Sequence, residues 1–311
     1  MLQRPIVLLP LSVATFLLAS CGSDSDLPIL AGNTQSASSV GESLYQKAKQ
    51  ADDAGNASKA IKLYDQTATE YSFAPSAAQA RYRQAELLAQ QGRTRDAFEA
   101  YDEFLQRFPG SPLYMTVLKR QAAVAQSAAD GDVKSSFLGL KTKLSLDDTV
   151  EMLGKVRDHA PKSATAAQAQ FTIGQLYLSK RKYKESIQAF RKLVLDQPAS
   201  AQAPEALFLV GQILMENADR GNQNQANLDL SREAFNDYLI QYPGHSRNAE
   251  ARSMLKSLSG RDLQRSFDVA EFYLKTGKKE SAKVYYRDVV KNSGSGNLHE
   301  ASKARLKELG E

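Results

Sequence analysis

The chain contains no tryptophan, one cysteine and three histidines in 311 residues. The single cysteine, Cys21, cannot form a disulfide within the chain, and a zinc site built on several cysteines is excluded. H-E-x-x-H, G-x-S-x-G, P-loop and G-x-G-x-x-G motifs are also missing, which argues against the common constellations for metal-dependent hydrolysis, acyl transfer and nucleotide binding. We therefore expect a protein that is not an enzyme and that holds no metal or cofactor.

The few residues that could carry chemistry have simpler structural explanations. His159 and His245 each lie beside a proline that ends a helical segment, so we expect both in solvated turns. The pair Asp147 and Asp148 precedes an apolar helical segment, and carboxylates are favourable at a helix N-terminus. We interpret this pair as part of a helix cap rather than as a catalytic dyad.

Long apolar runs are limited to one, at residues 6–19, which follows Arg4. This run is shorter than the about 20 residues that a membrane-spanning helix needs. A basic start, a short apolar core and small residues after it are typical of a secretory signal peptide. The residues L-A-S-C at 18–21 resemble the lipobox of bacterial lipoproteins, and this resemblance implies cleavage before Cys21 and lipidation of Cys21. The alternative is an ordinary signal peptide with a chance cysteine.

The residues after Cys21 bear on location. In lipoproteins of bacteria with two membranes, an Asp directly after the lipidated cysteine favours retention in the inner membrane. Here Gly22 and Ser23 follow the cysteine, so the resemblance to such lipoproteins does not imply retention there. We therefore expect a lipid-anchored protein of the outer membrane that faces the periplasm. Residues 21–40 are rich in Ser, Gly and Asp, so we expect a flexible tether there, after a signal peptide at 1–20 and before a folded domain at 41–311.

Four segments of the folded part share one spacing: a small residue, an aromatic four later, an apolar or aromatic residue three after that, and a helix-ending residue five further on. The four sets are Ala97-Tyr101-Phe104-Pro109, Ser186-Phe190-Leu193-Pro198, Ser231-Phe235-Tyr238-Pro243 and Ala282-Tyr286-Val289-Gly294. Another small residue precedes each set, and these are Ala85, Gly174, Gly211 and Ala270. Weaker copies occur around Ala48, Ala60 and Tyr64, and between 117 and 161.

This pattern resembles the tetratricopeptide repeat (TPR), a helix–turn–helix unit of 34 residues. Small residues let helices A and B of a repeat approach closely, and the proline ends helix B. The fold that we predict is all-α, a right-handed TPR α-solenoid of about six repeats with a capping helix at 298–310. The aromatics near the start of each helix A, Tyr45, Tyr82, Phe171, Phe208 and Phe267, are interpreted as core, with a ligand groove as the alternative.

Three segments depart from the repeat length. Residues 131–148 hold an apolar stretch that we expect to pack back onto the solenoid. Residues 218–229 are polar and predict a surface loop. Residues 248–258 predict a further helix between the fifth and sixth repeats.

The lipobox, the repeat lengths and the closing sequence at 270–293 and 301–309 resemble the BamD family of outer-membrane lipoproteins. The resemblance implies a scaffold of the β-barrel assembly (Bam) complex that binds the barrel component and the other Bam lipoproteins, and it suggests that unfolded outer-membrane proteins are bound as well.

An alternative is a TPR coordinator of the Tol–Pal and peptidoglycan type, but such proteins usually begin with a coiled coil and have no lipid anchor. A TPR-bearing enzyme would need a catalytic domain, for which no residues remain. Dense basic runs that would indicate nucleic-acid binding are also absent.

Two sets of candidate residues follow. Tyr45, Asp52, Asp53 and Tyr82 lie on helix A of the first two repeats, where side chains can line a groove for an extended peptide. Asp52 and Asp53 have a solvated turn as their simpler explanation.

The second set is at the C-terminal end, where residues 247–311 carry 14 basic and 9 acidic side chains, whereas 41–130 carry 11 of each. Lys278, Lys279, Arg287 and Arg305 are the candidates for contact with an acidic surface, which the resemblance suggests is the periplasmic part of the barrel component. The alternative is that this charge is solvated or lies near anionic lipid.

Overall fold

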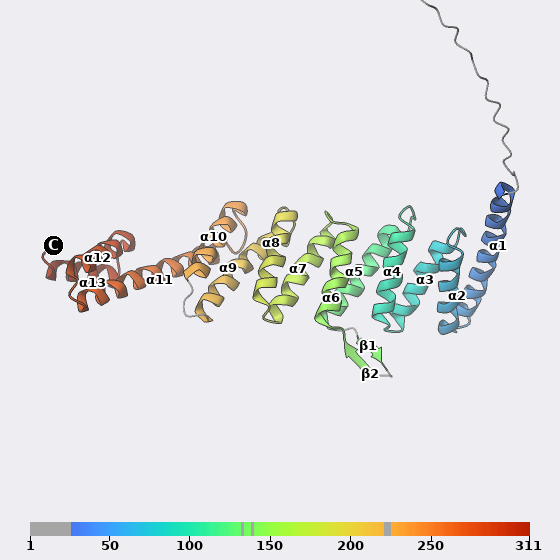
Figure 1. Cartoon of the computed structure of the whole chain (residues 1–311), viewed down its shortest axis with the longest axis horizontal. Coiled ribbons are helices and arrows are strands. Elements are labelled where there is room, and N and C mark those ends of the chain that lie inside the picture. Colours follow the sequence, from blue (N-terminus) through green and yellow to red (C-terminus); the bar gives the residue numbers. More distant parts are fainter. Residues whose placement is uncertain (1–25, 132–133, 138–139, 221–224) are drawn as a thin grey trace, which may run out of the picture. The chain divides into compact units, whose positions relative to one another are not determined.

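The computed structural model describes the backbone of residues 26–131, 134–137, 140–220 and 225–311, and the side chains of 36–131, 144–219 and 225–311. Cys21 and the expected signal peptide lie outside the described residues. The chain divides into two compact units, residues 1–80 and 81–311, and each is described by itself. The described part is almost wholly helical, with one short β-hairpin (Figure 1).

The first unit is built on a pair of helices, α1 (Asp26–Asp53) and α2 (Ala57–Glu70). Asn56 caps α2, because its side-chain Oδ1 accepts a hydrogen bond from the Lys59 backbone N–H at 3.2 Å. Ala48 and Ala60 are fully buried, and Tyr64 is 2% exposed. The weak first repeat predicted from these three residues is therefore confirmed.

The expected tether at residues 21–40 needs correction, because α1 already begins at Asp26. Serine and glycine only weakly disfavour a helix, and residues 29–40 contain no proline. Pro28 is the third residue of α1, where its missing N–H would have no intrahelical partner. Composition alone therefore predicted a flexible tether over residues 26–40, which belong to a helix.

The second unit is a succession of helix pairs (Figure 1). Its helices are α3 (Ala77–Gln90, which begins just before the unit), α4 (Thr94–Arg107), α5 (Tyr114–Asp130), α6 (Leu146–His159), α7 (Ala164–Ser179), α8 (Tyr183–Asp196), α9 (Ala203–Arg220), α10 (Gln225–Gln241), α11 (Asn248–Lys275), α12 (Lys279–Ser293) and α13 (Asn297–Glu308). From α4 onward each helix packs against the next, and α5 also contacts α7. With α1 and α2, the described residues form six helix pairs and a final helix, as predicted.

The predicted small and large positions meet inside each repeat. All twelve residues of the four repeat sets before the helix-ending position are at most 1% exposed. A Cβ atom added to Gly211 would lie 2.8 Å from the Phe235 ring, and one added to Gly174 would collide with the Phe190 ring. The hydroxyl groups of Ser186 and Ser231 donate hydrogen bonds to the carbonyls of Gly174 and Gly211, at 2.9 and 2.8 Å. Small residues are thus required where helices A and B cross.

The aromatics of helix A pair with those of helix B in the same repeat. The ring centroids are 5.8 Å apart for Tyr45 and Tyr64, 5.4 Å for Phe171 and Phe190, 5.3 Å for Phe208 and Phe235, and 5.7 Å for Phe267 and Tyr286. Tilted and edge-on pairs at such distances are favourable beyond the burial of their area. Phe208 is fully buried, and Phe171 and Phe267 are half-buried and pack against core clusters, as the core interpretation requires. Tyr45 is half-buried beside Tyr64.

The three departures from the repeat length fold differently from one another. Strands β1 (Lys134–Phe137) and β2 (Leu140–Lys143) pair antiparallel, with Phe137 opposite Leu140. The backbone of β1 lies beside α4, and the side chains of the hairpin lie outside those described. The predicted loop at 218–229 is wrong over most of its length, since α9 continues to Arg220 and α10 begins at Gln225.

The separate helix expected at 248–258 is also corrected. It is the first part of α11, which continues without interruption to Lys275 and includes helix A of the sixth repeat. Gly260 lies at the expected break, but a single exposed glycine costs a helix only about 1 kcal/mol. Burial of Ala251, Leu258 and Ala270 on the two parts of α11 offsets this cost.

Candidate functional site

Tyr45 and Asp52 belong to one small cluster in the first unit. The Tyr64 hydroxyl donates a hydrogen bond to Asp52 Oδ2 at 3.2 Å, and the Tyr45 ring packs on the Tyr64 ring. Burial, and then the charges of Glu42 and Asp52, raise the pKa of Tyr45 above its usual value. Half-buried Tyr45 is therefore partly a core residue, whereas Asp53 is exposed on α1.

Tyr82, by contrast, belongs to a cluster of the second unit. Its hydroxyl lies beside the Arg120 guanidinium, whose pKa is raised first by Glu86 and then by the hydrogen bond to Tyr82. Glu86 accepts a hydrogen bond from the Tyr101 hydroxyl at 2.5 Å. Burial, and then this bond, raise the pKa of Tyr101 far above its usual value. The structure thus brings Tyr45 together with Asp52 and places Tyr82 in a network that joins α3, α4 and α5.

A groove of about 370 Å³ lies between α5, α6 and α7. Its apolar lining includes Ala122, Leu153 and Val156, and its polar lining includes Gln126 and Gln168. Since α5 and α7 are helices A of successive repeats, this is the kind of surface on which the groove residues were expected.

Two residues that line this groove, Gln126 and Gln168, belong to a connected row of polar side chains, mostly amides. We call it the amide row: Gln126, Thr172, Gln168 and Gln202. Thr172 donates to Gln126 at 3.0 Å, Gln168 donates to Thr172 at 3.3 Å, and Gln202 donates to Gln168 at 2.8 Å. An amide offers both a donor and an acceptor, as the backbone of an extended peptide requires. No motif marks these residues in the sequence, because Gln126 is on α5, Gln168 and Thr172 are on α7, and Gln202 directly precedes α9.

Asp102 on α4 is the most heavily bonded carboxylate of the described residues. It is 5% exposed, and it accepts hydrogen bonds from Gln121 at 3.1 Å, Gln106 at 2.8 Å and Lys155 at 3.2 Å, while His159 Nε2 lies 2.6 Å away. Burial alone would raise the pKa of Asp102, but the bonds to His159 and Lys155 outweigh it and lower the pKa below its usual value. The cluster joins α4, α5 and α6.

His245 lies in the turn between α10 and α11, as predicted, whereas His159 is the last residue of α6, and neither imidazole is simply solvated. The His159 side chain is 17% exposed and contacts Asp102, and His245 Nδ1 shares a hydrogen bond of 2.6 Å with the buried Tyr238 hydroxyl. His299 is also buried, beside the Ser293 hydroxyl at 2.9 Å. His159 and His245 thus each contact a buried polar side chain, Asp102 and Tyr238, which the proline near each histidine does not reveal.

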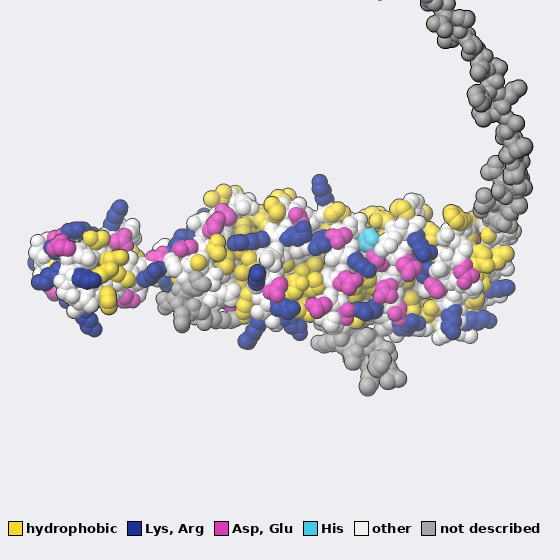
Figure 2. Space-filling model, in the orientation of Figure 1, with side chains coloured by type: hydrophobic (Ala, Val, Ile, Leu, Met, Phe, Trp, Pro, Cys, Tyr) yellow, Lys and Arg dark blue, Asp and Glu magenta, His cyan; other side chains and the backbone are white. Residues whose placement is uncertain are grey.

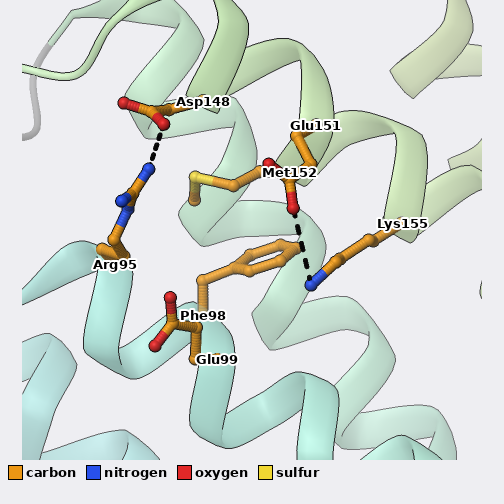
Figure 3. Close-up of a pocket in the computed structure, with 7 residues that line it drawn as sticks. All are labelled: Arg95, Phe98, Glu99, Asp148, Glu151, Met152 and Lys155. Atoms are coloured by element: carbon orange, nitrogen blue, oxygen red, sulfur yellow. Dashed lines mark hydrogen bonds and ion pairs between the residues drawn. The ribbon is translucent and has the colours of Figure 1, made fainter.

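A cleft of about 110 Å³ between α4 and α6 brings five charged side chains around Phe98 and Met152 (Figure 3). Asp148 pairs with Arg95, and Glu151 lies 3.8 Å from Lys155. The Ser145 hydroxyl caps α6 and contributes first to lowering the pKa of Asp148, before Arg95. Asp147 and Asp148 therefore lie in the first turn of α6, as the helix-cap interpretation predicts, and the N-cap residue is Ser145.

The four basic candidates at the C-terminal end are not equivalent. Arg287 Nε donates to Glu311 at 2.9 Å, and Arg305 pairs with Glu271 at 3.0 Å and Glu308 at 2.9 Å. Lys278 and Lys279 are exposed at the start of α12, and the Lys278 ammonium lies 5.8 Å from the Tyr273 ring centre. Carboxylates of the same chain thus already neutralise the two arginines. Figure 2 likewise shows basic and acidic side chains interspersed over the visible face.

No helix within the described ranges is both long and apolar enough to cross a membrane. In the same part of the chain, histidine, cysteine and carboxylate side chains nowhere gather in a group that could hold a metal ion.

Comparison with solved structures finds other TPR proteins. A TPR protein from Parabacteroides merdae is 16% identical, with 86% of this chain and 98% of that one covered and a TM-score of 0.31. The apo form of RapI is 14% identical, with 86% and 99% covered and a TM-score of 0.31. YrrB, described as a TPR protein with an unusual peptide-binding site, is 16% identical, with 73% and 92% covered and a TM-score of 0.30. Likenesses this slight carry no functional argument.

Family models give a more specific result. Residues 45–112 match a tetratricopeptide repeat model, in agreement with the helix pairs and their buried small and large positions. No curated protein matches the chain. Residues 140–304, more than half of the chain, match the YfiO model, described as an outer membrane lipoprotein. The all-α TPR chain described here therefore belongs to the YfiO, or BamD, family of outer membrane lipoproteins.

Proposed function

We propose that this protein is a lipid-anchored scaffold of the Bam complex, held on the periplasmic face of the outer membrane, where it binds the barrel component. The observation that supports this most is the family match over residues 140–304. The TPR-type fold of this family is a protein-interaction fold rather than an enzymatic one, and the surfaces described above are suited to binding peptides and proteins.

Lipidation of Cys21 would supply the anchor. One acyl chain gives only marginal membrane binding, whereas two or more give stable anchoring at about 0.8 kcal/mol for each buried CH₂ group. Mass spectrometry of the purified protein should find Cys21 as an acylated N-terminal residue. Unmodified Cys21, or cleavage elsewhere, would contradict the anchor.

Unfolded outer-membrane proteins are proposed as a second class of partner. The amide row and the apolar lining beside it support this proposal, since together they can bond the backbone of an extended chain and cover its apolar side chains. Of the candidates from the sequence, Tyr45, Asp52 and Tyr82 are partly occupied within their own clusters, and Asp53 is exposed. We therefore expect the main contribution from the groove between α5 and α7.

The barrel component is proposed to meet the C-terminal end of the second unit. We expect Lys278 and Lys279 to make the main contribution to this contact, because Arg287 and Arg305 form ion pairs with carboxylates of their own chain. An acidic surface on the periplasmic part of the partner would complement the two lysines. Contact with the other Bam lipoproteins is expected as well.

Depletion of the protein in its host tests the proposed function. Loss of a barrel-assembly scaffold should lower the amounts of many folded outer-membrane β-barrels together, which their heat-modifiable migration in gels reports. The alternative function, coordination of Tol–Pal and peptidoglycan, predicts impaired constriction at division with normal amounts of folded barrels. That second outcome would overturn the proposal.

A further inference from the structure

A second groove, apart from the surfaces considered so far, runs along α10 where this helix faces α8. Its volume is about 520 Å³. On α10 it is lined by Leu230, Glu233, Ala234, Asp237 and Gln241, which recur at intervals of one, three or four residues and so share one side of the helix. The eleven steps from Leu230 to Gln241 correspond to about 16 Å along the helix at a rise of 1.5 Å for each residue.

The bottom of this groove is apolar, and its edge exposes leucine. Val194 comes from α8 and Leu207 from α9, while Leu195 stands on the α8 edge with 81% of its surface exposed. The repeat requires only Leu193 to be buried, and Leu195, two residues on, points away from that position. A lone exposed leucine is common, but an exposed leucine beside a hollow apolar surface marks a place for a partner.

The charged side chains at the edges of the groove have no ion-pair partner among the described residues, whereas carboxylates on the neighbouring helices are paired with arginines. On α9 to α11, Glu205 and Glu250 pair with Arg247, Asp219 pairs with Arg261, and Asp229 and Asp262 pair with Arg232. Among the residues that the structure describes, neither Glu233 nor Asp237 has an ion-pair partner. These two carboxylates lie four residues apart on the same helix, where like charges repel. Arg191 lines the α8 side of the groove, also without a partner in the described part.

The length of the groove suits an elongated occupant. About 16 Å corresponds to about three turns of an α-helix, so a helix laid along the groove can direct side chains from successive turns onto its apolar lining. A single row of apolar side chains fits this space. An amphipathic helix presents such a row at positions i, i+3 or i+4, and i+7.

We propose that this groove binds an amphipathic helix of a partner protein. A row of aliphatic side chains from that helix fills the space between α8 and α10, and Lys or Arg along one edge of the helix pairs with Glu233 and Asp237. An acidic residue on the opposite edge pairs with Arg191. This proposal does not depend on the function proposed above, since it uses neither the amide row nor Lys278 and Lys279.

Two synthetic helical peptides of about 14 residues, near the length at which an isolated helix becomes stable, test the proposal on the purified full chain. Both carry the same row of leucines; one has lysines along the edge and the other has glutamates. Fluorescence anisotropy should show the basic peptide binding about tenfold or more tightly, because opposite charges are complementary at the edge. The double variant Glu233→Lys, Asp237→Lys should reverse this preference. Equal affinities, or a preference that the double variant leaves unchanged, would overturn the proposal.

Two further variants test whether the peptides bind at this groove rather than elsewhere on the chain. The double variant Glu70→Lys, Glu300→Lys makes the same change of net charge at exposed positions elsewhere, and it should leave the preference for the basic peptide intact. Leu195→Asn, at a position too exposed to threaten folding, should weaken both peptides. If sedimentation instead finds a concentration-dependent dimer that Leu195→Asn abolishes, a second copy of the chain occupies the groove, and the proposed partner helix is wrong.

Discussion

At the scale of single residues, the fit between a small side chain and an aromatic ring holds each repeat together. Gly174 and Gly211 leave room for the Phe190 and Phe235 rings, and the hydroxyl of a serine on helix B closes the same crossing with a hydrogen bond. This is a local requirement, because a single methyl group at either glycine would occupy the space of a ring atom.

We predict that Gly174→Ala or Gly211→Ala lowers the free energy of unfolding by about 1–3 kcal/mol, the usual cost of overpacking a core. The same change at Gly260, which is helical and has no neighbouring atom within 4 Å of an added Cβ, should instead stabilise by about 0.5–1 kcal/mol. Chemical denaturation of the three variants measures both effects. Stabilisation at all three sites would show that the two crossings are looser than described.

We also predict that Asp102 couples stability to pH. Its pKa is lower in the folded chain than its unfolded value of about 3.9, so the carboxylate adds stability above that value and loses it as pH falls through the folded pKa. The difference in free energy of unfolding between the wild type and Asp102→Asn should therefore be largest near neutral pH and shrink below about pH 4. A difference that stays constant from pH 7 to pH 3 would contradict the coupling.

At the scale of elements, α11 is the helix whose structure departs most from the repeat pattern. It joins an added segment to helix A of the sixth repeat through Gly260. Phe267 and Leu274 on its second part, and Leu306 and Leu309 near the C-terminus, all pack against the same core cluster of Ala270, Ala282 and Tyr286. A continuous helix therefore links the fifth repeat to the end of the chain.

We predict that Gly260→Pro lowers the free energy of unfolding by about 3 kcal/mol or more, since proline inside a helix removes a hydrogen bond and clashes with the preceding turn. Gly244→Pro is not an equivalent control, because Gly244 has a φ of +93° that proline cannot adopt. The better control is Gly110→Pro, at an exposed position after α4 with open space around it. Equal free energies of unfolding for the Gly110→Pro and Gly260→Pro variants would contradict a continuous α11 and favour the two separate helices that the sequence suggests.

The sequence predicts best the residues whose size and spacing recur in every repeat. The small, aromatic and apolar positions of the repeats, such as Gly211, Phe235 and Tyr238, were all placed correctly, because the distance between helices fixes both size and interval. The start of α1 and the continuity of α11 were missed, since serine, glycine and polar residues permit either a helix or a linker. The Asp102 cluster and the amide row were missed because their members come from different helices.

At the scale of the whole molecule, charge is distributed more evenly than the sequence suggests. The excess of basic residues at 247–311 includes Arg287 and Arg305, which are bound to Glu311 and to Glu271 and Glu308. Exposed ion pairs of this kind add little to stability. They do reduce the positive charge that is available to a partner.

We therefore predict a specific effect of Lys278→Glu, Lys279→Glu on binding to the periplasmic part of the barrel component. Association should slow, and its rate should depend less on salt, because these lysines supply the long-range attraction. Reversal of Lys59 and Lys62, which are exposed on α2 in the first unit, should change neither. Binding that is unchanged at low salt would place the contact elsewhere.

The most direct test of the central claim is quantitative co-purification of the protein from detergent-solubilised outer membranes. A C-terminally tagged wild-type chain should recover the barrel component of the assembly machinery in near-stoichiometric amount, and Cys21→Ala should remove the protein from the outer-membrane fraction before solubilisation. Recovery of Tol–Pal or peptidoglycan-associated proteins without the barrel component would contradict the account.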